Sequence, residues 1–95
     1  MNISIRLSKR SVKFIEKLPS KQARQIKTKI LSLKVNPFPQ DTKKLINDSR
    51  NRHRVDCGEY RIIYSLEEKI VSIDLVGKRN DNEVYKIMSR IQAND

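Results

Sequence analysis

Two closely spaced prolines, Pro37 and Pro39, divide the chain into halves with different hydrophobic periodicity. Before them, apolar residues recur at steps of three and four, the spacing of one helix face. After them, apolar and polar residues alternate, the pattern of a half-buried strand. Because proline lacks an amide hydrogen and disfavours helix in the preceding residue, residues 36–40 are predicted to be a loop. The sequence therefore predicts an α+β protein.

The N-terminal half is predicted to form a short strand and then a helical hairpin. Residues 2–7 alternate apolar and polar side chains, as expected for the strand. Ser8 is a suitable N-cap for a first helix that Pro19 ends, and Ser20 is suitable for a second. The predicted apolar stripes of the two helices are Val12, Ile15 and Leu18, then Ala23, Ile26, Ile30 and Leu33.

The C-terminal half is predicted to form a small antiparallel meander followed by a short C-terminal helix. Strands are expected at about residues 52–57, 59–66 and 70–77, and residues 41–51 are expected to be a connection held to the core by Leu45 and Ile46. The helical hairpin should pack on the sheet face that carries Val55, Tyr60, Ile62 and Tyr64. The final helix should cover part of the sheet with Val84, Ile87, Met88 and Ile91.

The positive charge of the chain is concentrated in its first half. Ninety-five residues are enough for one domain, residues 1–95, and the formal net charge is +10. Residues 17–34 contain six basic residues and no acidic one. This arrangement predicts a basic surface that docks on polyanionic RNA, and the alternative is a solvated, solubilising helix face. The residues expected to form this surface are Lys21, Arg24, Lys27 and Lys34.

Several classes of protein are not favoured by the sequence. No apolar stretch reaches the length of roughly 20 residues needed to cross a bilayer, and the N-terminus lacks the apolar run of a signal peptide, so we expect a cytoplasmic protein with no membrane partner. The chain has one cysteine, Cys57, and one histidine, His53, which predict neither an internal disulfide nor a zinc site. Cys57 is expected to be a packing residue and His53 an ordinary strand residue. We expect no metal and no cofactor.

Three arginines are predicted to share one side of the sheet. Strand side chains alternate between faces, so Arg52 and Arg54 should point the same way, and a hairpin turning at Gly58 would pair Asp56 with Arg61 on that face. Convergent guanidiniums repel one another unless an anion neutralises them, and guanidinium binds phosphate through two hydrogen bonds. The pattern therefore predicts a site for RNA or DNA backbone. The alternative is a solvated sheet face.

Several segments resemble the RelE/ParE superfamily of bacterial and archaeal toxins. They are residues 59–64 (EYRIIY), residues 76–79 (VGKR), residues 83–85 (EVY), and the upstream NPFP and KKL at residues 36–39 and 43–45. The resemblance extends from about Ile3 to Ile91 and includes the order of the predicted elements. It implies a RelE-like, microbial-ribonuclease-like fold, with an N-terminal strand and helical hairpin packed on a small antiparallel sheet.

The resemblance to RelE implies a ribosome-dependent, metal-independent endoribonuclease that cuts mRNA in the decoding site. In that chemistry the ribose 2′-OH attacks the adjacent phosphate, so the nucleophile belongs to the RNA. By position, Arg61 resembles the arginine that stabilises the transition state and Arg79 the one that assists the leaving oxygen. Tyr85 resembles the tyrosine that activates the 2′-OH and stacks on a base. The surrounding guanidiniums would favour its phenolate.

Three further positions are expected to bind RNA by the same resemblance, namely Arg52, Arg54 and Lys78. Arg52 and Arg54 stand where well-studied ribosome-dependent members carry lysine. Because arginine stays protonated at physiological pH, these two side chains can bind and stabilise but cannot act as a base. If any side chain takes the proton, the sequence favours Tyr85.

The resemblance also implies partners: a small antitoxin with a disordered tail, the ribosome and mRNA. Two other functions stay open at the level of sequence. One is a ParE-like toxin that binds DNA gyrase and has no nuclease site, although that branch generally lacks this set of tyrosine and arginines. The other is an RNA-binding module whose arginines hold the backbone without cleaving it.

Overall fold

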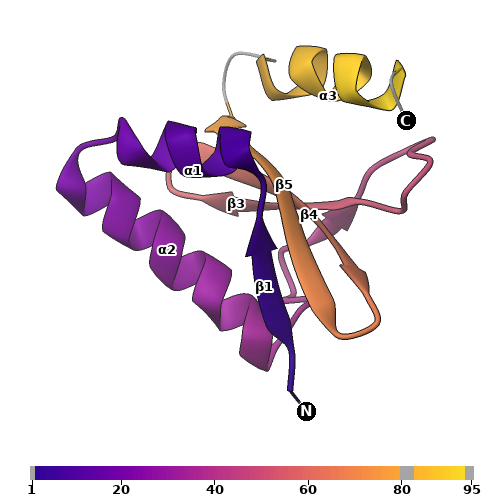
Figure 1. The fold of residues 1–95 in the computed structure, drawn as a ribbon, viewed down its shortest axis with the longest axis horizontal. Coiled ribbons are helices and arrows are strands. Elements are labelled where there is room, and N and C mark those ends of the chain that lie inside the picture. The colour runs from indigo at the N-terminus through magenta and orange to yellow at the C-terminus, as the bar shows by residue number, and fades with distance from the viewer. Residues whose placement is uncertain (1, 80–82, 94–95) are drawn as a thin grey trace.

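The fold is a five-stranded sheet with helices on both faces (Figure 1). The computed structural model describes residues 2–79 and 83–93. The elements are β1 (Ser4–Leu7), α1 (Lys9–Glu16), α2 (Ser20–Val35), β2 (Lys43–Lys44), β3 (His53–Cys57), β4 (Tyr60–Glu67), β5 (Ile70–Lys78) and α3 (Glu83–Ala93). Within the described residues, no helix is both long enough and apolar enough to cross a membrane.

The strands follow the order β1-β5-β4-β3-β2 across the sheet. The antiparallel meander of β3, β4 and β5 is confirmed, as is the predicted pairing of Asp56 with Arg61. Two features of the sheet were not predicted. β1 lies parallel to β5, with Ser4 opposite Ile70, and the two-residue β2 pairs with the start of β3. The α+β fold class is confirmed, with the N-terminal strand forming an edge of the same sheet.

The main core lies between the helical hairpin and one face of the sheet. Ile26 and Leu33 of α2 are fully buried there, together with Ile62 and Tyr64 of β4. Val55 is also buried, and Tyr60 packs partly against this cluster. The predicted buried face of the sheet is therefore confirmed. The spacing of these residues explains why this face is buried. Alternate residues of a strand point to the same side of the sheet, and residues three or four apart point to the same side of a helix, so these two sets meet between the layers.

A second, smaller cluster lies on the opposite face of the sheet. It contains Ile63, Leu75 and Met88, with Leu45 and Ile87 packed against it. α3 therefore covers part of this face, as predicted for Ile87 and Met88, and the side chains of Val84 and Ile91 lie outside the described residues. The predicted phosphate site therefore does not extend over the centre of this face, where Ile63 and Leu75 pack against Met88 of α3.

Some predicted boundaries and contacts are wrong. α1 ends at Glu16, before Pro19, and Val12 is 39% exposed. Ser11 is buried instead of Val12. Its hydroxyl accepts a hydrogen bond from Ser8 Oγ and donates one to the carbonyl of Ile73, so its polar group is satisfied inside the protein. Ser20 is the first residue of α2 rather than its cap, which is Pro19. Ile46 is 88% exposed, so of the two apolar residues predicted to hold the 41–51 connection to the core, Leu45 does so and Ile46 does not.

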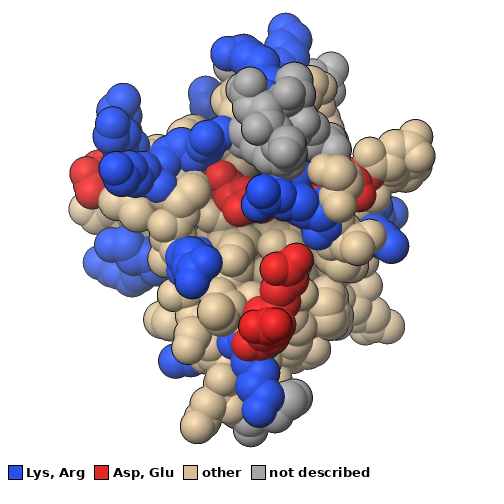
Figure 2. Space-filling view, turned by 45° about the vertical axis from the view of Figure 1, so that its right-hand side comes forward, with Lys and Arg blue, Asp and Glu red and all other residues tan. Residues whose placement is uncertain are grey.

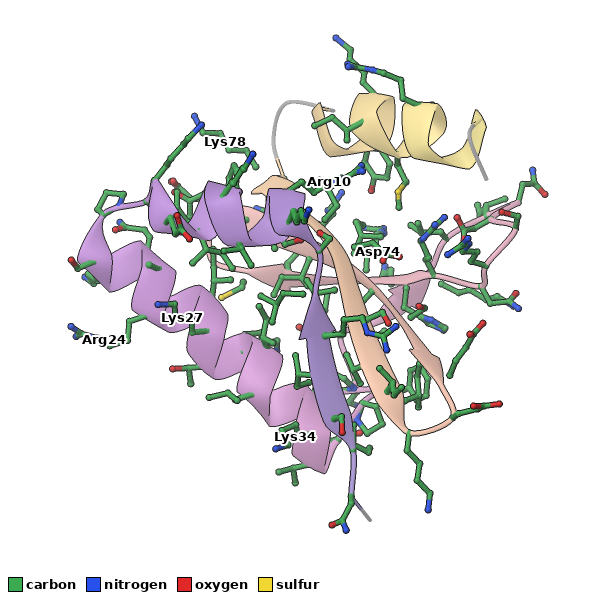
Figure 3. The ribbon with its side chains drawn as sticks, viewed as in Figure 1. Arg10, Arg24, Lys27, Lys34, Asp74 and Lys78 are labelled. Atoms are coloured by element: carbon green, nitrogen blue, oxygen red, sulfur yellow. The ribbon has the colours of Figure 1, made fainter. Side chains whose placement is uncertain are left out.

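Arg52 does not lie on the exposed arginine face where it was predicted. It is 1% exposed, and its guanidinium is held between Asp48, at 3.0 Å from Nη1, and Asp74, at 2.7 Å from Nε. Asp48 also accepts a 2.7 Å hydrogen bond from the backbone nitrogen of Arg52. Asp74 projects from β5 (Figure 3). Arg52 is therefore excluded as an RNA-binding residue, because Asp48, four residues before it, and Asp74 of β5 neutralise it inside the protein.

The Asp48 carboxylate depends on Arg52 for its charge state. Burial by itself raises the pKa of Asp48, but hydrogen bonds from the backbone and side chain of Arg52 and the charge of Arg52 outweigh it, so the pKa is lowered from its ordinary 3.8. A carboxylate with a lowered pKa stabilises the folded state above its ordinary pKa. The contribution is lost as the pH falls through the folded value.

Asp48→Asn is expected to lower the free energy of unfolding by about 2 kcal/mol at neutral pH, because it leaves the buried Arg52 guanidinium with weaker compensation. Chemical denaturation from pH 7 to pH 2 would measure this. The difference from wild type should shrink below the ordinary pKa of 3.8. Asp41→Asn is the control, because its 3.6 Å pair with Lys29 is exposed. Equal effects of the two substitutions at pH 7 would contradict this role for Asp48.

Candidate functional site

The β3–β4 hairpin holds Arg61 at the centre of a polar cluster. Gly58 makes the turn with φ of +59°, in the left-handed region that glycine adopts without strain. The turn sets Asp56 directly opposite Arg61, which in turn lies opposite Gly77 of β5. The Arg61 side chain is 13% exposed, so it is more enclosed than a solvated strand arginine. The strand register alone thus places a carboxylate beside this guanidinium.

Asp56 links Arg61 to Arg79. Its Oδ1 accepts a 2.8 Å hydrogen bond from Arg61 Nε, and its Oδ2 lies 3.4 Å from Arg61 Nη2 and 3.7 Å from Arg79 Nη1. Arg79 follows β5 and is anchored by a 3.0 Å bond from its backbone nitrogen to the carbonyl of Glu59. The sequence predicted the position of Asp56 but not its part in the site. The predicted register was the signal that could have found it.

Tyr85 reaches the same cluster from the first turn of α3. Its phenol oxygen accepts a 2.5 Å hydrogen bond from Arg61 Nη1, and Arg61 Cζ lies 5.5 Å from the centre of its ring. The ring is 36% exposed. The structure thus brings together the three predicted catalytic side chains, Arg61, Arg79 and Tyr85, from β4, the end of β5 and α3.

The charges in the cluster keep Asp56 ionised. The hydrogen bond from Arg61 lowers the pKa of Asp56, partial burial opposes the shift, and the charges of Arg61, Arg54 and Arg79 add to it. The same hydrogen bond raises the pKa of Arg61. The cluster therefore contains three guanidiniums and one carboxylate at neutral pH. Its excess positive charge fits a phosphodiester.

A hollow of about 400 Å³ adjoins Tyr85. Lys44 and Arg54 line it from β2 and β3, and Tyr85, Met88 and Ser89 line it from α3. Arg54 therefore lies near Tyr85, as its assignment to the site requires. Lys44 was not predicted to belong to the site. The pairing of β2 with β3 places it there, and nothing in the local pattern of residues 43–45 signals that pairing.

The other predicted RNA-binding residues lie away from this cluster. Lys78 pairs with Tyr60, on the sheet face that α1 and α2 cover, and lies near α1 in Figure 3. Arg24, Lys27 and Lys34 are spaced along α2 on the side of the molecule away from α3 (Figure 3). These three residues and Lys21 are exposed. Figure 2 shows basic side chains spread widely over the surface, with fewer acidic ones between them.

The sequence matches the family model of the ParE toxin of type II toxin–antitoxin systems over residues 5–83. The chain belongs to the RelE/ParE toxin family. The predicted membership is confirmed, and the fold agrees with it. No curated protein matches the sequence at a significant level.

Solved structures of RelE proteins resemble the toxin over most of its length. The archaeal RelE–RelB complex from Pyrococcus horikoshii OT3 has 26% identity and a TM-score of 0.75, over 85% of this chain and 99% of that one. The isolated E. coli RelE toxin has 26% identity and a TM-score of 0.68, over 94% and 98%. The RelBE2 complex from Mycobacterium tuberculosis has 20% identity and a TM-score of 0.72, over 83% and 100%, and shows the shared fold alone.

Proposed function

We propose that this toxin is a ribosome-dependent endoribonuclease that cuts mRNA in the decoding site and so inhibits translation. The observation that carries the proposal is the contact of Arg61 with Tyr85 on one side and, through Asp56, with Arg79 on the other. This arrangement places two guanidiniums, which can donate hydrogen bonds to a phosphate, beside the phenol oxygen of Tyr85, which is hydrogen-bonded to Arg61. Such a set is suited to phosphodiester chemistry in which the nucleophile comes from the RNA.

In the proposed reaction, the ribose 2′-oxygen forms a bond to the adjacent phosphorus and the bond from phosphorus to the 5′-oxygen breaks. The products are a 2′,3′-cyclic phosphate and a 5′-hydroxyl. Arg61 stabilises the dianionic phosphorane, and Arg79 donates a hydrogen bond to the departing 5′-oxygen, which takes its proton from solvent.

In this proposal Tyr85 accepts the proton of the 2′-OH. The hydrogen bond from Arg61 Nη1 to its oxygen supports the assignment, because it holds that oxygen beside the guanidinium that would bind the phosphate. The hollow beside Tyr85 supports the stacking role. At about 400 Å³ it can take a nucleobase, and Lys44 and Arg54 at its edge can bind the flanking backbone.

The exposed basic side chains of α2 are proposed to bind ribosomal RNA. They lie on a different side of the molecule from α3, so the toxin could contact rRNA and mRNA at the same time. A toxin acting on the ribosome would work in the cytoplasm.

An antitoxin with a disordered tail is the proposed partner in the same cell. The P. horikoshii relative, at 26% identity, was solved as a RelE–RelB complex, and this similarity is the support for a partner. The net charge of +10 suits a partner whose tail carries acidic residues.

A ParE-like toxin that binds DNA gyrase is the second candidate, and the ParE family model is the observation in its favour. The two candidates differ in their target. A gyrase-binding toxin would inhibit supercoiling by purified gyrase and leave mRNA on programmed ribosomes intact, whereas the nuclease would do the reverse. The arrangement of Arg61, Arg79 and Tyr85 favours the nuclease, since gyrase binding needs no phosphate-centred site.

Arg61→Ala is expected to slow single-turnover cleavage of mRNA on programmed ribosomes by two to three decades, roughly the effect of removing one donor to a developing charge. Arg6→Ala is the control, because Arg6 is an exposed arginine on the distant edge strand β1. If Arg61→Ala cuts within threefold of wild type and melts normally, Arg61 has no part in the reaction.

Tyr85→Phe is expected to keep stacking and lose proton transfer, so that it binds programmed ribosomes like wild type but cuts slowly. Tyr85→Ala should lose both functions. Because the ring is 36% exposed, the Phe variant should melt close to wild type. Cleavage rate, ribosome affinity and melting temperature would be measured for both variants. A Phe variant with the full wild-type rate would rule out Tyr85 as the base.

Reversing the charge of Lys21, Arg24 and Lys27 together to Glu is expected to weaken ribosome binding and to flatten its dependence on salt, because each phosphate contact releases counterions. Affinity would be measured over a series of salt concentrations. Acid-induced or thermal unfolding of the variant checks the fold. An unchanged salt slope would show that α2 is only a solvated face.

A further inference from the structure

A carboxylate occupies the position among the arginines where a phosphate would bind. Asp56 Oδ1 takes the Nε–H of Arg61 at 2.8 Å, and Asp56 Oδ2 lies between Arg61 Nη2 and Arg79 Nη1, at 3.4 and 3.7 Å. A phosphodiester carries two non-bridging oxygens with a similar demand for N–H donors. The two anions therefore compete for the same edge of Arg61 and for the same nitrogen of Arg79.

The Arg61 guanidinium and the Asp56 carboxylate differ in their freedom to move. The Arg61 side chain is 13% exposed and is also held through Nη1 by Tyr85, whereas Asp56 is 35% and Arg79 45% exposed. The partly exposed carboxylate of Asp56 can turn into water, which replaces part of the hydrogen bonding that it gives up. The guanidinium can thus stay in place while its anion is exchanged.

We propose that Asp56 is an internal competitor for the RNA backbone phosphate, which holds Arg61 and Arg79 in the free toxin and is displaced when RNA binds. The inference rests on the proposed function for the identity of the ligand. It explains how guanidiniums from β4 and the end of β5 remain together without RNA, since Asp56 offsets part of their mutual repulsion. It also implies a threshold, because a phosphate must outcompete Asp56 and needs further contacts to do so.

Asp56→Asn is the test, because it keeps the size of the side chain and removes its charge. The probe is a 2′-O-methyl trinucleotide, which has backbone phosphates but no nucleophile and spans little more than the site. The shift of the Arg61 Nε–H resonance would give its dissociation constant. Removing one competing, partly exposed charge should tighten binding about three- to fivefold.

Glu68→Gln is the matched control. It removes one negative charge from the β4–β5 turn, at the end of β4 remote from Arg61, and Glu68 is exposed. The control should leave the dissociation constant within twofold of wild type. Inorganic phosphate as a second probe separates a general anion effect from backbone recognition. Because free phosphate competes with Asp56 for the same N–H donors, Asp56→Asn should tighten its binding by a similar factor, whereas Glu68→Gln should leave it unchanged; a gain for phosphate with none for the trinucleotide would overturn the proposal.

The wild-type protein supplies a measurement that does not depend on the variant. Titration with the trinucleotide should shift the Arg61 Nε–H resonance, because its acceptor changes from carboxylate to phosphate. Unchanged affinity in Asp56→Asn, weaker binding, or a wild-type Nε–H that does not respond would each overturn the proposal; weaker binding would mean that Asp56 positions Arg61 for the phosphate.

Cleavage on programmed ribosomes is measured separately, so that the two proposals can fail independently. Tighter trinucleotide binding by Asp56→Asn without cleavage by wild type would leave the competitor role standing and remove the nuclease function. Cleavage by wild type, with no gain in trinucleotide affinity in Asp56→Asn, would support the nuclease function and remove the competitor role of Asp56.

Discussion

The antiparallel pairing of β3 with β4 across the Gly58 turn is the constraint on which the site depends. It sets one sheet face for the core through Val55 and Ile62, and it sets Asp56 beside Arg61 on the other. A slip of one residue would exchange the two faces, burying Arg61 and exposing Ile62, so the apolar core itself enforces the register. Stability and the polar cluster thus depend on the same pairing.

The second face of the sheet is divided between packing and chemistry. Its centre is apolar, where Ile63 and Leu75 meet Met88 of α3. Its end near the β3–β4 turn is polar, where Arg61 meets Tyr85. α3 serves both regions, because one helix carries Met88 for the core and Tyr85 for the cluster, three residues apart and so on neighbouring positions of one helix face. Packing of α3 therefore fixes the distance between phenol and guanidinium.

Two arginines that were predicted to share one sheet face have opposite uses in this toxin. Arg52 is buried between Asp48 and Asp74 and has a structural role, whereas Arg61 is partly exposed and shares Asp56 with Arg79. The difference lies in the partners. Arg52 has two carboxylates in a closed site, while Asp56 is a single carboxylate shared by two guanidiniums at the surface. Only the second arrangement retains excess positive charge for an anion from outside.

The sequence by itself determined the three helices, every strand except β2, the main core face and the pairing of Asp56 with Arg61, because periodicity and a short turn are local properties of the chain. It also indicated the family through the segments around Arg61, Arg79 and Tyr85. Tertiary structure alone decided the parallel pairing of β1 with β5, the burial of Arg52 and the place of Lys44 beside Tyr85. Each of these joins residues from separate segments, and the free energy of such contacts depends on which segments meet, which no local pattern encodes.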